Sequence, residues 1–170
     1  PAAFGQLRKI IRFMKKRADA CPANFKSAYL LLCAGWMVYK HKTQEALRYY
    51  QEAEKEAETY NQLNILSVIH QRRAELYQQE GMQELSLYYA AQAYQTNELW
   101  GASAVNQQLL QRFPGFRPAE TRRDTNDAHN PLSTTTHTTA LDLQSILKAL
   151  ENGWNSFEGL LSGSSGHSTR

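Results

Sequence analysis

The sequence has few cysteines, no long apolar run and no alternation of apolar and polar residues. Its two cysteines, Cys21 and Cys33, provide neither a disulfide framework nor metal-ligand spacing, which is typical of a reducing, cytoplasmic environment. No apolar run approaches the roughly 20 residues of a membrane-spanning helix, so we expect no membrane span. Strands usually show a period of two residues, and the lack of that period predicts an all-α fold.

Charge of one sign is also scarce. The 170 residues carry 19 Lys and Arg against 16 Asp and Glu, a net charge of +3. Nucleic-acid binding normally needs a concentrated basic face, so this small surplus predicts no nucleic-acid partner. The chain begins Pro-Ala-Ala-Phe without an initiator Met, which is expected after removal of the Met or in a piece of a longer protein.

Residues arranged for catalysis are not evident. No glycine-rich loop precedes a Lys-Ser or Lys-Thr pair, and the five histidines are far apart and lack partners at metal-ligand spacing. His70 lies on a predicted helix, but Gln71 follows it where a phosphoacceptor histidine usually has an acidic neighbour, so we expect a packing role. The sequence therefore predicts no enzyme activity, no catalytic, cofactor-binding or metal-binding residues, and no cofactor.

Apolar spacing of helical type runs from Phe4 to Phe113. It predicts a first helix with one apolar stripe, and a second helix that is apolar almost all round and must be covered on several sides. Cys21-Pro22 should end the first helix, Thr43 should be an N-cap, and Gly81 should supply a left-handed terminator. The stripe of the first helix consists of Phe4, Leu7, Ile10, Ile11 and Met14. The later helices are predicted at about 23–39, 44–59, 63–80, 82–99 and 102–113.

The first helix has a basic surface between Lys9 and Arg17. Such a surface can contact phosphate or an acidic membrane, but no interleaved aromatic residues offer a platform for bases. We therefore favour a solvated outer face, or an electrostatic partner of the acidic helix at 44–59. Trp36 and Trp100 are expected in the core rather than as ligand-stacking residues.

These helices contain an internal repeat with an offset of 40 residues. The matching pairs are Ala34 with Ala74, Met37 with Tyr77, Ala46 with Ser86, Tyr49 with Tyr89, and Ala53 with Ala93. Small residues at a helix crossing with aromatic residues beside them are typical of tetratricopeptide-like hairpins, although the standard unit has about 34 residues. An ordinary helical bundle is the alternative, since it also needs small and aromatic residues. We favour the repeat, which predicts an α-solenoid of antiparallel hairpins over residues 1–114.

The composition changes after residue 114. Residues 115–139 are rich in Ser, Thr, Asp, Asn and Pro and are predicted to be a flexible linker. Residues 140–152 are predicted to form one short amphipathic helix, and residues 153–170 a disordered Ser/Gly-rich tail. The apolar face of the short helix consists of Leu141, Leu143, Ile146, Leu147 and Leu150.

Several short motifs, in a fixed order, resemble a family of large multidomain signalling kinases. They are Ala46-x-x-Tyr49-Tyr50-x-x-Ala53, Ala74-Glu75-Leu76-Tyr77 with Gly81, Tyr88-Tyr89-x-x-Gln92-Ala93-Tyr94, Trp100-Gly101-Ala102, Arg112-Phe113-Pro114, and Leu141 to Ala149. In that family, mainly cyanobacterial and other bacterial, a serine/threonine-kinase-like domain precedes an AAA-type predicted ATPase. A tetratricopeptide-like array, a GAF sensor domain and often a histidine-kinase module follow. The matching segment, roughly residues 8–149, would be the end of the array and the linker into the GAF domain.

The resemblance implies a noncatalytic scaffold or relay segment that contacts other domains or a partner protein. It carries over no catalytic residue, because the kinase, nucleotide-binding and phosphoacceptor residues of the family have no counterpart here. The family's last helix normally continues past Ala149, whereas Leu150-Glu151-Asn152-Gly153-Trp154 breaks it, as expected for a truncated or excised chain. The Leu141–Leu150 helix would pair with the same helix of a second chain, giving a homodimer, or with the adjoining sensor domain. The alternative function is a freestanding tetratricopeptide-like protein-binding module.

Overall fold

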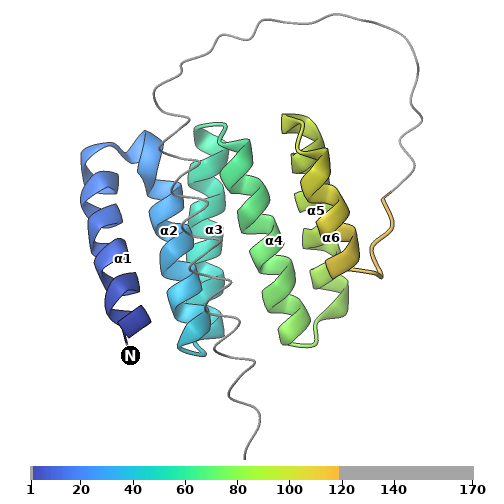
Figure 1. Ribbon diagram of the computed structural model, residues 1–170, viewed down its shortest axis with the longest axis horizontal. Coiled ribbons are helices and arrows are strands. Elements are labelled where there is room, and N and C mark those ends of the chain that lie inside the picture. Colours follow the sequence, from blue (N-terminus) through green and yellow to red (C-terminus); the bar gives the residue numbers. More distant parts are fainter. Residues whose placement is uncertain (1, 119–170) are drawn as a thin grey trace, which may run out of the picture. The chain divides into compact units, whose positions relative to one another are not determined.

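The computed structural model describes residues 2–118, which contain six helices and no strand (Figure 1). The helices are α1 (Ala2–Ala20), α2 (Pro22–Tyr39), α3 (Thr43–Thr59), α4 (Leu63–Gln79), α5 (Gln83–Trp100) and α6 (Ser103–Arg112). The all-helical prediction is confirmed for this part of the chain, and every predicted boundary of α2 to α6 lies within one residue of the observed one. The predicted short helix at 140–152, the tail at 153–170 and all but the first residues of the linker at 115–139 lie outside the described residues.

Four turns of one type join the helices from α2 to α6. Each has a left-handed residue, at His41 (φ 56°), Asn61 (φ 51°), Gly81 (φ 74°) and Gly101 (φ 80°), so the left-handed residues recur every 20 positions. In each turn the next N–H donates back to a carbonyl five residues earlier, at 2.8–2.9 Å, which is the Schellman arrangement. The predicted role of Gly81 is confirmed. His41 and Asn61 adopt the same backbone without the freedom of glycine, so the turn geometry outweighs the local steric cost.

Thr43 is not the N-cap that the sequence suggested. Lys42 holds that position and Thr43 is already the first residue of α3. The Schellman turn fixes the helix start without a capping side chain, and the Thr43 hydroxyl instead donates to Glu80 Oε1 at 2.9 Å.

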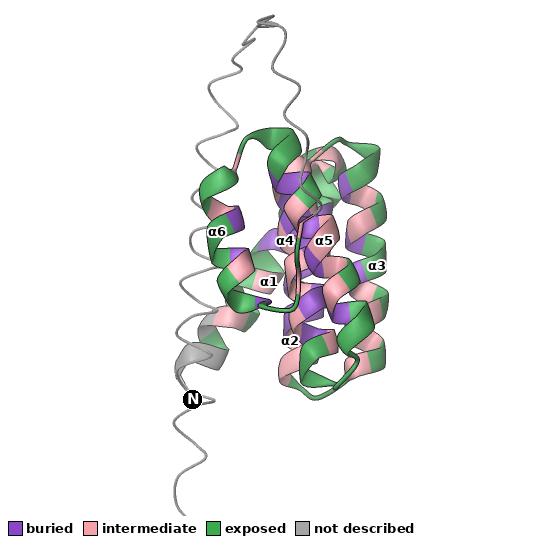
Figure 2. Ribbon diagram, turned by 90° about the vertical axis from the view of Figure 1, so that its right-hand side faces the viewer, coloured by how far each residue is buried: buried purple, intermediate pink, exposed green. Residues whose placement is uncertain are grey.

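Residues that lie 40 positions apart are buried at corresponding helix contacts. α2 packs most extensively on α3, and α4 on α5, while α4 also contacts α3 and α2. The small residues of the predicted pairs all have 0% of their surface exposed; they are Ala34, Ala46, Ala53, Ala74, Ser86 and Ala93. Figure 2 shows the buried positions lying along the faces where α3, α4 and α5 meet. The Ser86 hydroxyl donates to the Ala74 carbonyl at 2.9 Å, which shows how closely α5 crosses α4.

α2 is buried almost all round, as predicted, because α1, α3 and α4 all pack on it. Its Cys33 is a buried free thiol whose pKa is raised by burial, and Cys21 is also free. The Tyr29 hydroxyl lies beside the Cys33 thiol, and burial raises the pKa of Tyr29 to about 12. These groups serve packing in a core that excludes their charged forms.

The stripe predicted for α1 is partly wrong. Met14 is buried and Leu7 and Ile11 are half-buried, but Ile10 is 43% exposed and Ala18 completes the inner face instead. Among the described helices, α1 packs mainly on α2, and the spacing 7, 11, 14, 18 is what one flank of a helix allows. The Phe4 side chain lies outside the described part. No described helix has the length and apolar character needed to cross a membrane.

The packed region continues past the residue 114 boundary predicted for it. Phe113 is buried in a cluster with Ala74, Ala90, Ala93 and Leu109. Phe116, in the first residues of the predicted linker, packs on the same cluster, with its ring centroid 5.5 Å from that of Tyr94.

The buried alanines give a first test of this packing. Ala53→Leu or Ala93→Leu should overpack the crossing and lower the free energy of unfolding by about 1–3 kcal/mol. Chemical denaturation measures this directly, with Leu99→Ala as a control because the Leu99 side chain is 74% exposed. Wild-type stability in both leucine variants would contradict the assigned register.

Candidate functional site

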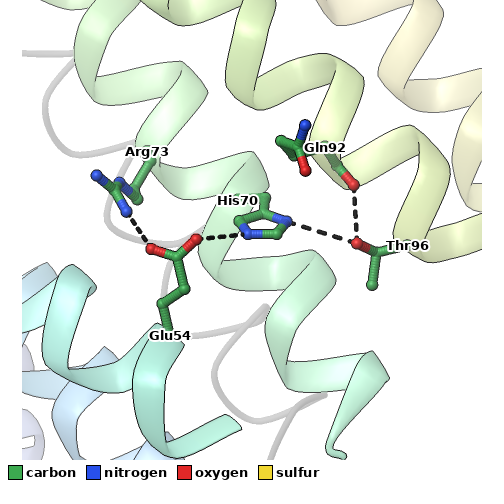
Figure 3. Close-up of polar contacts among 5 residues, drawn as sticks. All are labelled: Glu54, His70, Arg73, Gln92 and Thr96. Atoms are coloured by element: carbon green, nitrogen blue, oxygen red, sulfur yellow. Dashed lines mark hydrogen bonds and ion pairs between the residues drawn. The ribbon is translucent and has the colours of Figure 1, made fainter. Parts of the chain in front are cut away.

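A polar cluster lies where α3, α4 and α5 meet (Figure 3). Glu54 comes from α3, and His70 and Arg73 come from α4, where a spacing of three residues puts them on one helix face. We call these three residues the junction cluster. Thr96 of α5 contacts its far side. Within the junction cluster, His70 and Arg73 are buried and Glu54 is half-buried. Water therefore screens the charges of Glu54 and Arg73 only weakly.

Glu54 bridges the two basic side chains of the junction cluster. Its Oε1 accepts from His70 Nε2 at 2.9 Å, and its Oε2 accepts from Arg73 Nη1. Burial acts to raise the pKa of the Glu54 carboxyl, but the hydrogen bond of His70 and the charges of Arg73 and His70 outweigh burial. The pKa of Glu54 therefore lies below its ordinary value of 4.5. The carboxylate is held in its charged form.

His70 faces hydrogen-bond acceptors on both sides. The Thr96 hydroxyl donates its hydrogen to the Gln92 carbonyl at 2.8 Å, which leaves a lone pair towards His70 Nδ1, 3.5 Å away. The Glu54 carboxylate offers another lone pair to Nε2. The two ring nitrogens of His70 thus contact α3 on one side and α5 on the other. His70 therefore packs between helices, as predicted, and it does so through polar contacts.

Arg73 is held between Glu54 and an aromatic group on α5. Its guanidinium carbon lies 4.0 Å from the ring centroid of Tyr89. Tyr89 in turn stacks on Tyr77 at 5.5 Å and meets the edge of Tyr88 at 5.1 Å. Burial raises the pKa of Tyr89, against the effect of the nearby Arg73 charge. Arg73 Nε is buried and has no hydrogen-bond partner among the described residues, which adds to the cost of burying this cation.

The junction cluster differs in chemistry from the residues 40 positions before and after it. Forty residues earlier stand Met14, Leu30 and Cys33, all buried, where α1 meets α2. Forty residues later stand Tyr94, Leu110 and Phe113, where α5 meets α6. The middle of these three helix junctions is therefore polar where its two neighbours are apolar.

Two further polar groups fasten α6 to α4 and α5. Glu75 of α4 accepts from Arg72 at 2.8 Å and from Arg112 of α6 at 2.5 Å. Asn97 of α5 donates to Asn106 of α6 at 2.9 Å. The Asn97 carbonyl oxygen also accepts from Trp100 Nε1 at 3.2 Å and from the Ser67 hydroxyl. None of these contacts is evident from the spacing of residues in the sequence.

The prediction that Trp36 and Trp100 lie in the core is wrong. Trp100 is 38% exposed, because it is the last residue of α5 and sits at the turn into α6. Trp36 is half-buried near the end of α2, beside Tyr39 and beneath the cations of Arg8 and Lys40. Each indole covers a helix end.

The basic surface of α1 is exposed, as expected for an outer face. Lys15 pairs with Asp19 within α1, at 2.9 Å, and Glu56 of the acidic α3 receives Lys26 of α2, at 2.6 Å. Neither pair joins α1 to α3, so the suggested pairing of these two helices has no support here.

The chemistry of the junction cluster is that of an internal ionic lock. Its carboxylate and imidazole are already engaged with each other and with Arg73. Within residues 2–118 no three His, Cys, Asp or Glu side chains are grouped so as to hold a metal ion. His41 lies exposed in a turn, and His129, His137 and His167 lie outside the described residues.

Comparisons with known proteins give no relative: no family model, no curated protein and no solved structure matches the chain.

Proposed function

We propose that this chain is a noncatalytic, tetratricopeptide-like helical scaffold that makes protein–protein or interdomain contacts. One observation carries the proposal: helix hairpins recur with a 40-residue offset and place small residues at equivalent, fully buried crossings. Repeats of this kind bury a continuous core between neighbouring hairpins and leave long surfaces free for partners. Its unit is longer than the usual tetratricopeptide unit of about 34 residues.

The proposal extends to the parent protein through the resemblance to multidomain signalling kinases. In such a protein the scaffold would relay information between an ATPase side and a GAF sensor side. The internal ionic lock at the α3–α4 junction fits this role, because a buried polar contact specifies one register between two hairpins. The kinase activities of such a parent would reside in other domains.

The DNA that flanks this coding sequence tests the relay function. Read in all frames, it should encode a nucleotide-binding ATPase upstream and a GAF domain downstream. If neither is found, the relay function is contradicted and the freestanding protein-binding module becomes the better explanation. That second function has one observation in its favour: the outer face of α6 is exposed and polar, at Ser103 and Gln107, as in a helix that closes an array.

A further inference from the structure

The outer face of α5 carries a row of residues at positions 85, 88, 92, 95 and 99. The alternating spacing of three and four residues places them along one side of the helix. Three of them are apolar or aromatic and exposed: Leu85 is 43%, Tyr88 55% and Leu99 74% exposed. Between them, Gln92 is half-buried and Gln95 is exposed. We call these five residues the α5 stripe.

The same face is mostly charged on α1 and α3, the helices equivalent to α5 under the 40-residue offset. The equivalent residues are Glu45, Arg48, Glu52, Lys55 and Thr59 on α3, and Gly5, Arg8, Arg12, Lys15 and Asp19 on α1. On α3 they are exposed, or half-buried in the case of Glu45, although α2 and α4 pack on either side. Neighbouring helices of the array therefore leave this face uncovered, and α5 itself has both α4 and α6 beside it. The exposure of the α5 stripe is a property of the face and not of a chain end.

Tyr88 is held in place from beneath. Its ring meets the edge of Tyr89 at 5.1 Å, Tyr89 stacks on Tyr77 at 5.5 Å, and the guanidinium carbon of Arg73 lies 4.0 Å from the Tyr89 ring centroid. An exposed tyrosine supported in this way loses little side-chain freedom when a partner covers it. Tyrosine is also enriched among the residues that dominate binding energy at interfaces between proteins. The α5 stripe thus offers a fixed aromatic anchor between two exposed leucines.

Charge indicates the kind of partner. α5 has no Lys or Arg, and its two acidic residues, Glu84 and Glu98, are both exposed. Each directly precedes a leucine of the stripe, and the two are 14 positions apart, so they lie on the same flank of the stripe. Residues at this place beside a helix–helix seam meet the flanking residues of the partner helix. Lysine or arginine on the partner would be attracted there.

Two occupants from the chain itself fit this charge less well. A second copy lying antiparallel on the stripe would bring Glu84 of one copy beside Glu98 of the other, and a parallel copy would leave both glutamates without a cation. Residues 140–152 carry Asp142 and Glu151 against Lys148, so they offer no basic flank. A basic partner is therefore favoured over both.

We propose that the α5 stripe binds an amphipathic helix of a partner protein, with apolar residues along one face and lysine or arginine beside them. Leu85, Tyr88 and Leu99 contact the apolar face of the partner, and the basic residues of the partner pair with Glu84 and Glu98. The inference rests on the proposed scaffold function and names the surface and the partner chemistry for it.

A labelled peptide tests the proposal on the full chain. The probe is a helical peptide with the 18-residue length of α5, leucines at alternating spacings of three and four, and lysines beside them. Fluorescence anisotropy gives its affinity. Leu85→Glu combined with Tyr88→Arg gives α5 the residues that α3 carries at these positions and leaves the net charge unchanged. This double variant should weaken binding by at least about tenfold.

The matched control is Ile10→Glu combined with Phe13→Arg. Ile10 and Phe13 are 43% and 54% exposed and have the same spacing of three residues, so the same chemistry changes on a different helix. Its affinity for the peptide should equal that of the unsubstituted chain. Glu84→Gln should weaken binding by up to about fivefold at low salt, and the loss should shrink at high salt. Circular dichroism verifies that all variants keep their helices.

Five results would overturn the proposal. They are no binding by the unsubstituted chain, equal affinity for a peptide with glutamates in place of the lysines, equal affinities of the two double variants, self-association that Leu85→Glu with Tyr88→Arg abolishes, and tighter peptide binding after Leu147→Glu. The fourth result would assign the α5 stripe to a second copy, and the fifth would assign it to residues 141–150 of the chain itself. Each leaves the scaffold function standing, because the flanking DNA and the repeat register are tested separately.

Discussion

Glu54→Met is expected to lower the free energy of unfolding by about 3–5 kcal/mol. The substitution removes the carboxylate that accepts from both His70 and Arg73 and leaves the buried Arg73 cation without its ion-pair partner. Methionine stands at the equivalent position in α1, where it is buried, so the side chain itself suits the site. Urea denaturation monitored by circular dichroism measures the loss.

The matching rescue replaces the whole junction cluster by its apolar equivalents. Glu54→Met, His70→Leu and Arg73→Cys together reproduce the Met14, Leu30 and Cys33 of the α1–α2 junction. Buried ion pairs replaced by apolar side chains are often neutral or stabilising, so this triple variant should recover most of the stability lost by Glu54→Met. A triple variant no more stable than the single one would show that the three junctions are not equivalent.

Acid should destabilise the unsubstituted chain more than the triple variant. The folded-state pKa of Glu54 is lowered, so its stabilising contribution is complete above the ordinary carboxyl value of 4.5 and is lost as the pH falls through the folded-state pKa. The free energy of unfolding of the unsubstituted chain should therefore fall more steeply below pH 4.5 than that of the triple variant. Parallel acid profiles would contradict the charge state assigned to Glu54.

Phe113→Ala should cost about 3–5 kcal/mol, which is typical for a buried phenylalanine. Phe113 follows α6 and is 1% exposed in the cluster formed by α4, α5 and α6. The loss should appear in thermal or chemical unfolding of the full chain. Leu99→Ala, at a mostly exposed site on α5, should change the stability by less than about 0.5 kcal/mol. Similar losses in the two variants would mean that residues 113–116 do not close the core.

The helix boundaries could be predicted from the sequence because each depends on a few neighbouring residues. Cys21-Pro22, Gly81 and Gly101 act locally, and the apolar spacing between them is of helical type. His41 and Asn61 give a weaker signal, and their left-handed conformation becomes evident only from the 20-residue period of the turns. The error at Ile10 arose because spacing alone does not say how many neighbours cover a helix.

The junction cluster could not be predicted from spacing within any one helix. In the sequence, Glu54 is one of several glutamates of the acidic helix at 44–59, and the neighbours of His70 give no sign of its ionic partner. The available signal was the change from apolar to polar across the 40-residue offset, at positions 14, 54 and 94 and at 33, 73 and 113. Even that signal does not reveal that Glu54 reaches α4, because the contact depends on how two hairpins pack.

Deletion of residues 43–82 tests the 40-residue register most directly. It removes α3, α4 and the whole junction cluster, and joins the first Schellman turn to α5. Ser27 then takes the place of Ser67 opposite Asn97, and Ala34 takes the place of Ala74 against Ser86. Far-UV circular dichroism with urea denaturation should show a helical chain that unfolds cooperatively, with lower stability than the parent. Deletion of residues 33–70 joins α2 to α4 within one helix, two positions out of the 40-residue register, which turns the α4 half by about 200° and should abolish cooperative unfolding. Equal behaviour of the two deletions would contradict the repeat.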